Sequence, residues 1–337
     1  MRNHHQTSVS IHHFSDLMAT FESLGLAHHI KAADRIAVKP NLCAGTICLP
    51  PSGVVTNPQV LDMVVQALVG LNDHASVAIV ESDSTGPGLA VDKFAHQGYP
   101  QRFSRYSQVR LVDLSRSPVS RYTCPGRYFR HGLVLPRIIR EADLFVSVGK
   151  MKTHSNTVVT GILKNQFGCL PESDKEKYHP FLPEVIADIN AVARPHLCIL
   201  DAVPAMEGNG PVQGSPVDLD LLILGTDPVA VDSTMARMMG FDPERIPMLR
   251  VAQDAGIGTT RPDHIAIRGL PMDSVCRPFR YISWERHAYV QLGFAIQRFG
   301  KRVQDFGHLV HCVEGTAWAA RKLHKRMRQR LGKNGDG

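Results

Sequence analysis

Apolar residues alternate along the chain between short runs of strand length and longer stretches in which they recur at helical spacing. Asn57-Pro58 opens one such stretch, with proline at a tolerated first-turn position. The pattern predicts strands at 35–39, 76–81, 109–114, 143–148, 196–201, 219–225 and 264–268, and helices at 57–71, 89–97, 183–193, 228–239 and 247–255.

Strands separated by helices of about 10 to 15 residues are typical of α/β proteins with a parallel sheet. We therefore predict an α/β fold: a mainly parallel sheet with helices on both faces, plus a C-terminal helical extension. Residues 1–278 would form the α/β domain, either undivided or as two lobes of about 20–140 and 141–278. Residues 279–337 would form a basic amphipathic extension.

The formal net charge of +7 is concentrated near the C-terminus. From Arg280 onward the chain has 12 lysines and arginines against 4 acidic residues, which leaves 26 against 27 in residues 1–279. A near-neutral body lacks the basic surface that binds nucleic acids, so we expect no nucleic-acid partner.

The chain lacks the usual sequence signals of membrane insertion and of cysteine-based metal sites. No stretch approaches the roughly 20 apolar residues that span a bilayer, and the first residues lack a signal peptide's apolar core. We expect a cytoplasmic protein. The seven cysteines include no C-x-x-C motif, so no iron–sulfur cluster is expected. Cys43 and Cys169, each beside a polar motif, are the two thiols to test for reactivity.

Polar and charged residues follow several predicted strands. Ligands of open α/β sheets bind outside the carboxyl ends of the strands, so clusters at that edge can share one site. Any single cluster has a simpler explanation, since strands must end in something polar. Together they lead us to expect Lys39, Lys150, Lys164 and Asp201 in one cleft. The clusters are Lys39-Pro40-Asn41, Glu81-Ser82-Asp83, Gly149-Lys150, Asp201 and Thr226-Asp227.

The segment GKMKTHSNTVVTGILKNQFGC, residues 149–169, is dense in lysine. Lysine carries a compact, strongly hydrated charge that is costly to place beside a sheet without a partner. Such charges, with amide donors, suit the carboxylate or phosphate of a small anionic molecule. The alternative is structural ion pairing with Glu81, Asp83, Asp201 and Asp227. The predicted substrate-binding residues are Lys39, Asn41, Lys150, His154, Thr160, Asn165 and Glu207.

Residues 160–168, T-G-x-x-K-N-x-x-G, have a superficial likeness to a phosphate-binding loop, but neither G-x-x-x-x-G-K-[ST] nor G-x-G-x-x-G is present. His179 follows this loop, and histidine titrates near neutral pH, so it could act as a general acid or base. We predict catalytic roles for Lys152, Lys164 and His179.

A second polar group is acidic. Asp201 and Glu207 are candidate ligands for Mg²⁺ or Mn²⁺, or could balance the lysines and set their pKa values. Asp227, which precedes Pro228, is most simply a helix N-cap.

Together these residues resemble the domain of unknown function 362 (DUF362) family over most of residues 35–260. The resemblance rests on Lys39-Pro40-Asn41, the GKMKTH and TGILKNQFG segments, His179, LDAVPAMEGNGP, and GTDPVAVD followed by MGFDP. Many relatives carry a ferredoxin-like segment with C-x-x-C-x-x-C spacing, which implies redox chemistry for them. This chain lacks that segment. A weaker likeness is to the nickel-dependent lactate racemase group, by analogy only.

The C-terminal extension carries an apolar stripe at steps of four and three residues, followed by a strongly basic end. Three settings for residues 290–325 remain open: packing on the α/β domain, pairing in a homodimer, or contact with an anionic membrane surface. The stripe comprises Leu292, Ile296, Phe299, Val303, Phe306, Val310, Val313, Ala317 and Ala320.

The leading hypothesis is an enzyme of small-molecule metabolism that binds an anionic substrate at the lysine-rich strand ends and carries out redox or acid–base chemistry. The competing hypothesis is a non-catalytic accessory protein that holds an anionic metabolite or a metal for a partner enzyme.

Overall fold

The computed structural model describes residues 6–17, 27–42, 52–84, 89–282 and 289–300. Contacts divide the chain into two compact units, Met1–His287 and Ala288–Gly337. The predicted division after residue 278, like the two lobes, stays a prediction. Cys43 lies outside the described residues.

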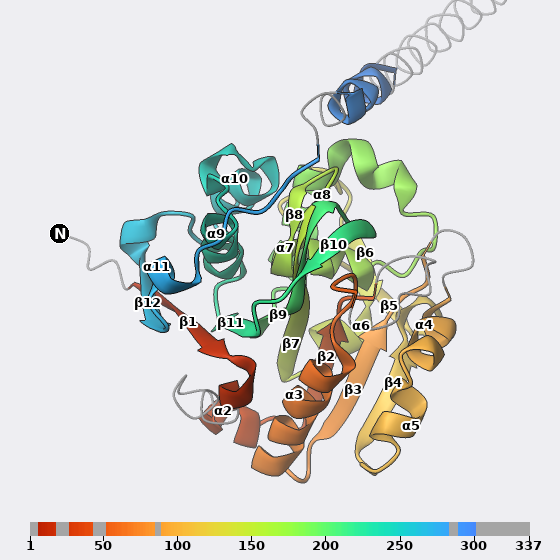
Figure 1. The fold of residues 1–337 in the computed structure, drawn as a ribbon. Helices are drawn as coiled ribbons and strands as arrows, with labels where there is room; N and C mark the ends of the chain where they lie inside the picture. The colour runs from red at the N-terminus through yellow and green to blue at the C-terminus, as the bar shows by residue number, and fades with distance from the viewer. Residues whose placement is uncertain (1–5, 18–26, 43–51, 85–88, 283–288, 301–337) are drawn as a thin grey trace, which may run out of the picture. The chain divides into compact units, whose positions relative to one another are not determined.

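The first unit is built around a central twisted sheet with helices on both sides (Figure 1). Among the described residues ten strands join it, eight of them in the order β12-β1-β11-β9-β7-β2-β3-β4. Neighbours along this path are parallel except where β11 pairs with β1 and β9. The strands are β1 (Thr7–His13), β2 (Arg35–Pro40), β3 (Ser76–Glu81), β4 (Val109–Asp113), β7 (Leu144–His154), β9 (Leu197–Asn209), β11 (Leu221–Gly225) and β12 (Ile265–Gly269).

Shorter strands extend the structure at its margins. β8 (Val158–Thr160) pairs antiparallel with β7, and β10 (Gln213–Val217) pairs antiparallel with β9. β5 (Val119–Tyr122) and β6 (Leu133–Pro136) form a separate antiparallel pair.

Helices cover both faces of the sheet, because successive strand residues feed two different cores. In β2, Ile36 and Val38 belong to one core and Ala37 to the other. The first core includes α3 (Pro58–Leu71), α4 (Ala90–His96) and α5 (Tyr99–Phe103). The second includes α7 (Gly161–Asn165), α8 (Leu182–Val192), α9 (Pro228–Met238) and α10 (Pro247–Asp254). The predicted fold class is therefore confirmed. The described part of the unit also contains three short α-helices: α2 (Ala27–Lys31), α6 (Arg137–Arg140) and α11 (Met272–Val275).

The order of the parallel strands reverses at β2. From β2 the chain builds outward through β3 and β4, and it later returns to place β7 and then β9 on the opposite side of β2. At such a switch point the connections leave in opposite directions and open a crevice at the carboxyl ends of the strands. Lys39 lies near the end of β2 and Glu81 ends β3, so both are at this edge.

Two strands are longer than the apolar pattern predicts. β7 continues through Lys150 and Lys152 to His154, and β9 continues through Asp201 to Asn209. The predicted ends of these strands, after residue 148 and at Asp201, are therefore wrong. Backbone pairing between β7 and β9 continues at Lys150 with Asp201 and at Lys152 with Met206, which keeps both lysines inside the sheet.

In the second unit, residues 289–300 are helical. Tyr289, Leu292, Ile296 and Phe299 are exposed and recur at steps of three and four, so they share one side of the helix. The three settings for residues 290–325 stay predictions, and residues beyond 300 lie outside the described part of the chain. No helix of the described residues is long and apolar enough to cross a membrane.

Candidate functional site

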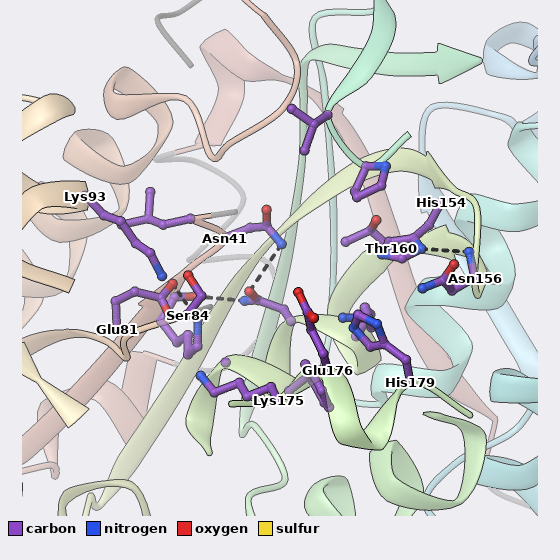
Figure 2. A pocket seen from close by; sticks show the side chains of 18 of the residues that line it. Asn41, Glu81, Ser84, Lys93, His154, Asn156, Thr160, Lys175, Glu176 and His179 are labelled. Atoms are coloured by element: carbon purple, nitrogen blue, oxygen red, sulfur yellow. Dashed lines mark hydrogen bonds and ion pairs between the residues drawn. The ribbon is translucent and has the colours of Figure 1, made fainter. Parts of the chain in front are cut away.

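A cavity of about 380 Å³ opens at the carboxyl ends of β2 and β3, beside the far end of β7. Figure 2 shows Glu81, Lys93 and Lys175 on one side of it, and His154, Thr160 and His179 on the other. It is lined by Lys39, Asn41, Leu42, Glu81, Ser84, Lys93, His154, Ser155, Asn156, Thr160, Lys164, Asn165, Phe167, Gly168, Lys175, Glu176, His179, Pro211 and Val212.

A buried ion pair forms one wall of the cavity. Lys39 Nζ lies 2.9 Å from Glu81 Oε2 and donates to the Pro40 carbonyl at 3.0 Å. Burial alone would raise the pKa of Glu81, but Lys39, Lys93 and Lys175 together outweigh burial and lower that pKa. Gly168 packs against this pair: a Cβ there would lie 2.7 Å from Lys39 Nζ, so only glycine fits without displacement.

Two further lysines gather around the end of β3. Lys93, from α4, donates to the Ser82 carbonyl at 2.8 Å. Lys175 donates to the Ser82 hydroxyl and to the Asp83 carbonyl, the latter at 2.8 Å. Burial lowers the pKa of Lys175 to about 8, with Glu81 acting in the opposite direction. The cavity wall therefore contains an amine that a small change of environment can neutralise.

The opposite wall combines Lys164 with two histidines. Lys164 Nζ lies 4.3 Å from the centre of the Phe167 ring, and the His179 ring lies 6.2 Å from that ring. Burial, with the nearby Lys164 charge, lowers the pKa of His179 to about 4. Burial and Lys164 also lower the pKa of His154 well below its ordinary value. Both imidazoles are therefore neutral at pH 7. The lone pair of His154 is engaged, because its Nδ1 accepts from the Asn156 amide at 3.0 Å.

Neutral donors link the two walls. Asn165 donates to the Lys39 carbonyl and to Ser147 Oγ, each at 3.0 Å, which fixes the amide of the α7 C-terminus over β2. Asn41 donates to Asn165 Oδ1 at 3.5 Å. The buried Thr160 hydroxyl has no hydrogen-bond partner among the described residues, although it lines the cavity. An unsatisfied buried hydroxyl is unfavourable, and a bound polar ligand would satisfy it.

In residues 160–168, which have a likeness to a phosphate-binding loop, the backbone amides bind a carboxylate of the protein itself. The amides of Ile162 and Leu163 donate to the buried carboxylate of Asp232, at 2.6 and 2.9 Å. Gly161 has φ +62°, and a Cβ there would collide with the same carboxylate. Burial raises the pKa of Asp232 to about 7. Asp232 thus anchors α7, and α7 positions Lys164.

Lys150 and Lys152 do not line the cavity. Lys150 Nζ lies 2.8 Å from Asp201 Oδ2, and both side chains are fully buried. Lys152 donates to the carbonyls of Val54, at 2.5 Å, and Pro211, at 3.1 Å. The prediction of a single cleft is met by Lys39 and Lys164 but is wrong for Lys150 and Asp201, because the strand extension of β7 and β9 buries them as a pair. The structural ion-pair alternative describes this pair better.

The acidic residues proposed as metal ligands are engaged by protein donors. Asp201 also accepts from the amides of Asn57 and Val203, each at 2.7 Å. Glu207 accepts from the Arg280 amide at 2.8 Å and its Nε at 2.7 Å. Within the described ranges, no group of three or more His, Cys, Asp or Glu side chains is arranged to hold a metal ion. A magnesium or manganese site stays a prediction.

Sequence reasoning identified seven of the residues that line the cavity: Lys39, Asn41, His154, Thr160, Lys164, Asn165 and His179. It missed Lys93, Lys175 and Glu176. Lys93 belongs to a regular helix, whose charged residues are usually solvated. Lys175 and Glu176 stand in the charged run SDKEKYHP, whose proximity to His179 was the one available signal.

The sheet order defines a doubly wound α/β protein, and a cavity lined in part by lysines lies at its switch point. The chain belongs to the family described as Domain of unknown function (DUF362), whose sequence model matches residues 36–237. That range includes every residue that lines the cavity.

Two proteins show more distant similarity. Thylakoid-associated protein sll1697 of Synechocystis sp. is 28% identical over 243 residues, covering 70% of this chain and 72% of that protein. The lactate racemase apoprotein from Thermoanaerobacterium thermosaccharolyticum matches with a TM-score of 0.42 and 13% identity. That match covers 70% of this chain, which spans 58% of the racemase chain.

Proposed function

We propose that the cavity is the active site of an enzyme that binds a small carboxylate or phosphate and moves a proton on it. Its lining supports the affinity for anions: four lysines and two glutamates leave a surplus of two positive charges when both histidines are neutral. A volume of about 380 Å³ suits a small metabolite. Thr160 and Asn41 would add hydrogen bonds that fix its orientation.

The observation that carries the proposal is the pairing of a neutral histidine with a cation in one cavity. His179, with its pKa lowered to about 4, is unprotonated at pH 7. A bound anion beside it would raise that pKa toward the range of an efficient general base, so that His179 can take a proton from the substrate. The Lys164 ammonium group beside it would stabilise the negative charge that develops on the substrate oxygens as the proton leaves. Lys39, Lys93 and Lys175 would hold the anionic group, as point charges on a largely buried surface.

The test is proton exchange. A panel of small 2-hydroxy acids, 2-oxo acids and phosphate esters is incubated with the protein in D₂O, and deuterium incorporation at carbon is followed by ¹H NMR. His179→Gln should lower the exchange rate at least about 100-fold while leaving the substrate Kd within about threefold. Lys164→Met should lower the exchange rate more than it weakens binding, because Lys164 would stabilise the charge that develops as the proton leaves. The matched control is His131→Gln, since His131 is exposed and outside the cavity.

Exchange that survives His179→Gln would contradict the proposed base. A panel compound that binds without exchanging would instead favour the non-catalytic alternative, a binding protein that holds an anion for a partner. One observation favours that alternative: Lys39, Lys93 and Lys175 already have protein acceptors, as in a rigid, preformed binding site.

A further inference from the structure

A second cavity, of about 450 Å³, lies at the amino ends of β2, β3 and β4. Arg35 and Ser76 are the first residues of β2 and β3, and both line it. No residue lines both this cavity and the one that contains Lys164. The two cavities therefore lie at opposite ends of β2 and β3.

The hollow has a simple origin in the strand register. Ala37 pairs with Ala78, and Ala78 pairs with Arg110, so one row across three strands contains two methyl groups and an arginine. Side chains in such a row project from the same face of the sheet. The two alanines are buried, at 0% and 3% exposure, and form the base of the cavity, while the four-residue helix α6 contributes Arg137 and Ile138 to its wall.

Three arginines from three elements surround the hollow: Arg35 of β2, Arg110 of β4 and Arg137 of α6. Arg35 Nη2 lies 3.1 Å from Asp143 Oδ1, and Arg137 Nε lies 2.6 Å from Glu141 Oε1. The Arg110 side chain has no hydrogen bond or ion pair with any residue in the described ranges. With Asp143 and Glu141 paired to Arg35 and Arg137, the three arginines retain a surplus of one positive charge, that of Arg110.

We propose that this cavity binds a small phosphate monoester. A phosphate monoester is close to a dianion at pH 7, and the exposed guanidinium groups of Arg35, Arg110 and Arg137 can share that charge. The guanidinium group of Arg110 can bind two phosphate oxygens at once, a geometry that lysine does not offer. Val112 and Ile138, both partly exposed, supply an apolar surface for the body of the molecule, above the buried methyl groups of Ala37 and Ala78. This binding is independent of the reaction proposed for the other cavity.

The probe is phenyl phosphate, compared with phenol, which lacks the charge, and with inorganic phosphate, which lacks the apolar body. Binding to the full-length protein is followed by NMR of ¹³C-labelled alanine methyl groups. The expected result is a saturable shift of the Ala37 and Ala78 methyls with phenyl phosphate. Phenol should cause no such shift, and inorganic phosphate should bind more weakly.

Arg110→Gln should weaken phenyl phosphate binding at least about tenfold, because it removes the unpaired bidentate donor. The matched control is Arg250→Gln on α10, an exposed arginine outside the cavity, which should leave Kd unchanged. The proposal is overturned if the alanine methyls do not shift, if the two variants weaken binding equally, or if phenyl phosphate shifts only residues around Lys164.

Discussion

Replacing Lys150 by methionine tests whether the fully buried Lys150–Asp201 pair is structural. Methionine keeps most of the side-chain volume, so the variant removes the charge and leaves the packing largely intact. The Asp201 carboxylate would then be buried without its counter-ion, and breaking a buried ion pair typically costs about 3–5 kcal/mol. Because Asp201 keeps two backbone donors at 2.7 Å, we expect a value near the lower end, about 3 kcal/mol.

The assay is equilibrium unfolding in urea, with the free energy of unfolding extrapolated to water. Lys31→Met serves as the matched control, since Lys31 is exposed on α2 and should change stability by less than about 0.5 kcal/mol. Adding Asp201→Asn to Lys150→Met should recover part of the loss, because it removes the orphaned charge. A loss below about 1 kcal/mol in the single variant would refute the structural interpretation.

Three further predictions follow from the site. Gly168→Ala should lower the free energy of unfolding by about 1–3 kcal/mol, because the new Cβ collides with Lys39; urea denaturation measures it. Since the pKa of His179 falls to about 4 in the fold, the unfolded state takes up a proton first as the pH drops. The stability that depends on His179 is therefore full above about pH 6.5 and lost toward pH 4, and His179→Gln should remove this part of the pH dependence in melting experiments, while the part due to His154 remains. Burial raises the pKa of Cys169 to about 12, so mass spectrometry should find it alkylated at pH 8 roughly a hundredfold more slowly than the exposed Cys276.

The fold was largely predictable because, in most elements, the apolar pattern and the capping residues favour the same structure as the packing of the folded chain. The apolar run at 76–81 coincides with β3. Asp227 does cap α9, accepting from the amides of Val229 and Ala230 at 2.9 and 3.0 Å. Such caps depend on residues two or three positions apart, so the sequence contains the whole interaction.

The ends of β7 and β9 depend on interactions that the local sequence does not contain. From the local sequence, the charged Lys150 is expected to lie beyond the end of the strand. Its partner, Asp201, is 51 positions later in the chain, so the local sequence does not show that the charge is paired. The same reasoning applies to the cavity. Strand-end residues such as Lys39 were predictable from topology, whereas Lys93 and Lys175 reach the site only because a helix and a loop pack against Ser82.

The place of β1 in the sheet has a consequence for synthesis. This strand of residues 7–13 lies between β11, which begins at residue 221, and β12, which begins at residue 265. At about 5–20 residues per second, a ribosome needs roughly 10–40 s to make the first of these neighbours. Throughout that interval neither strand that pairs with β1 has been synthesised. Val9 and Ile11, which are fully buried in the finished protein, therefore belong to a segment without a pairing partner. A nascent chain stalled before residue 221 would therefore present a strand open to pairing with other chains, and its aggregation should end once β11 has emerged.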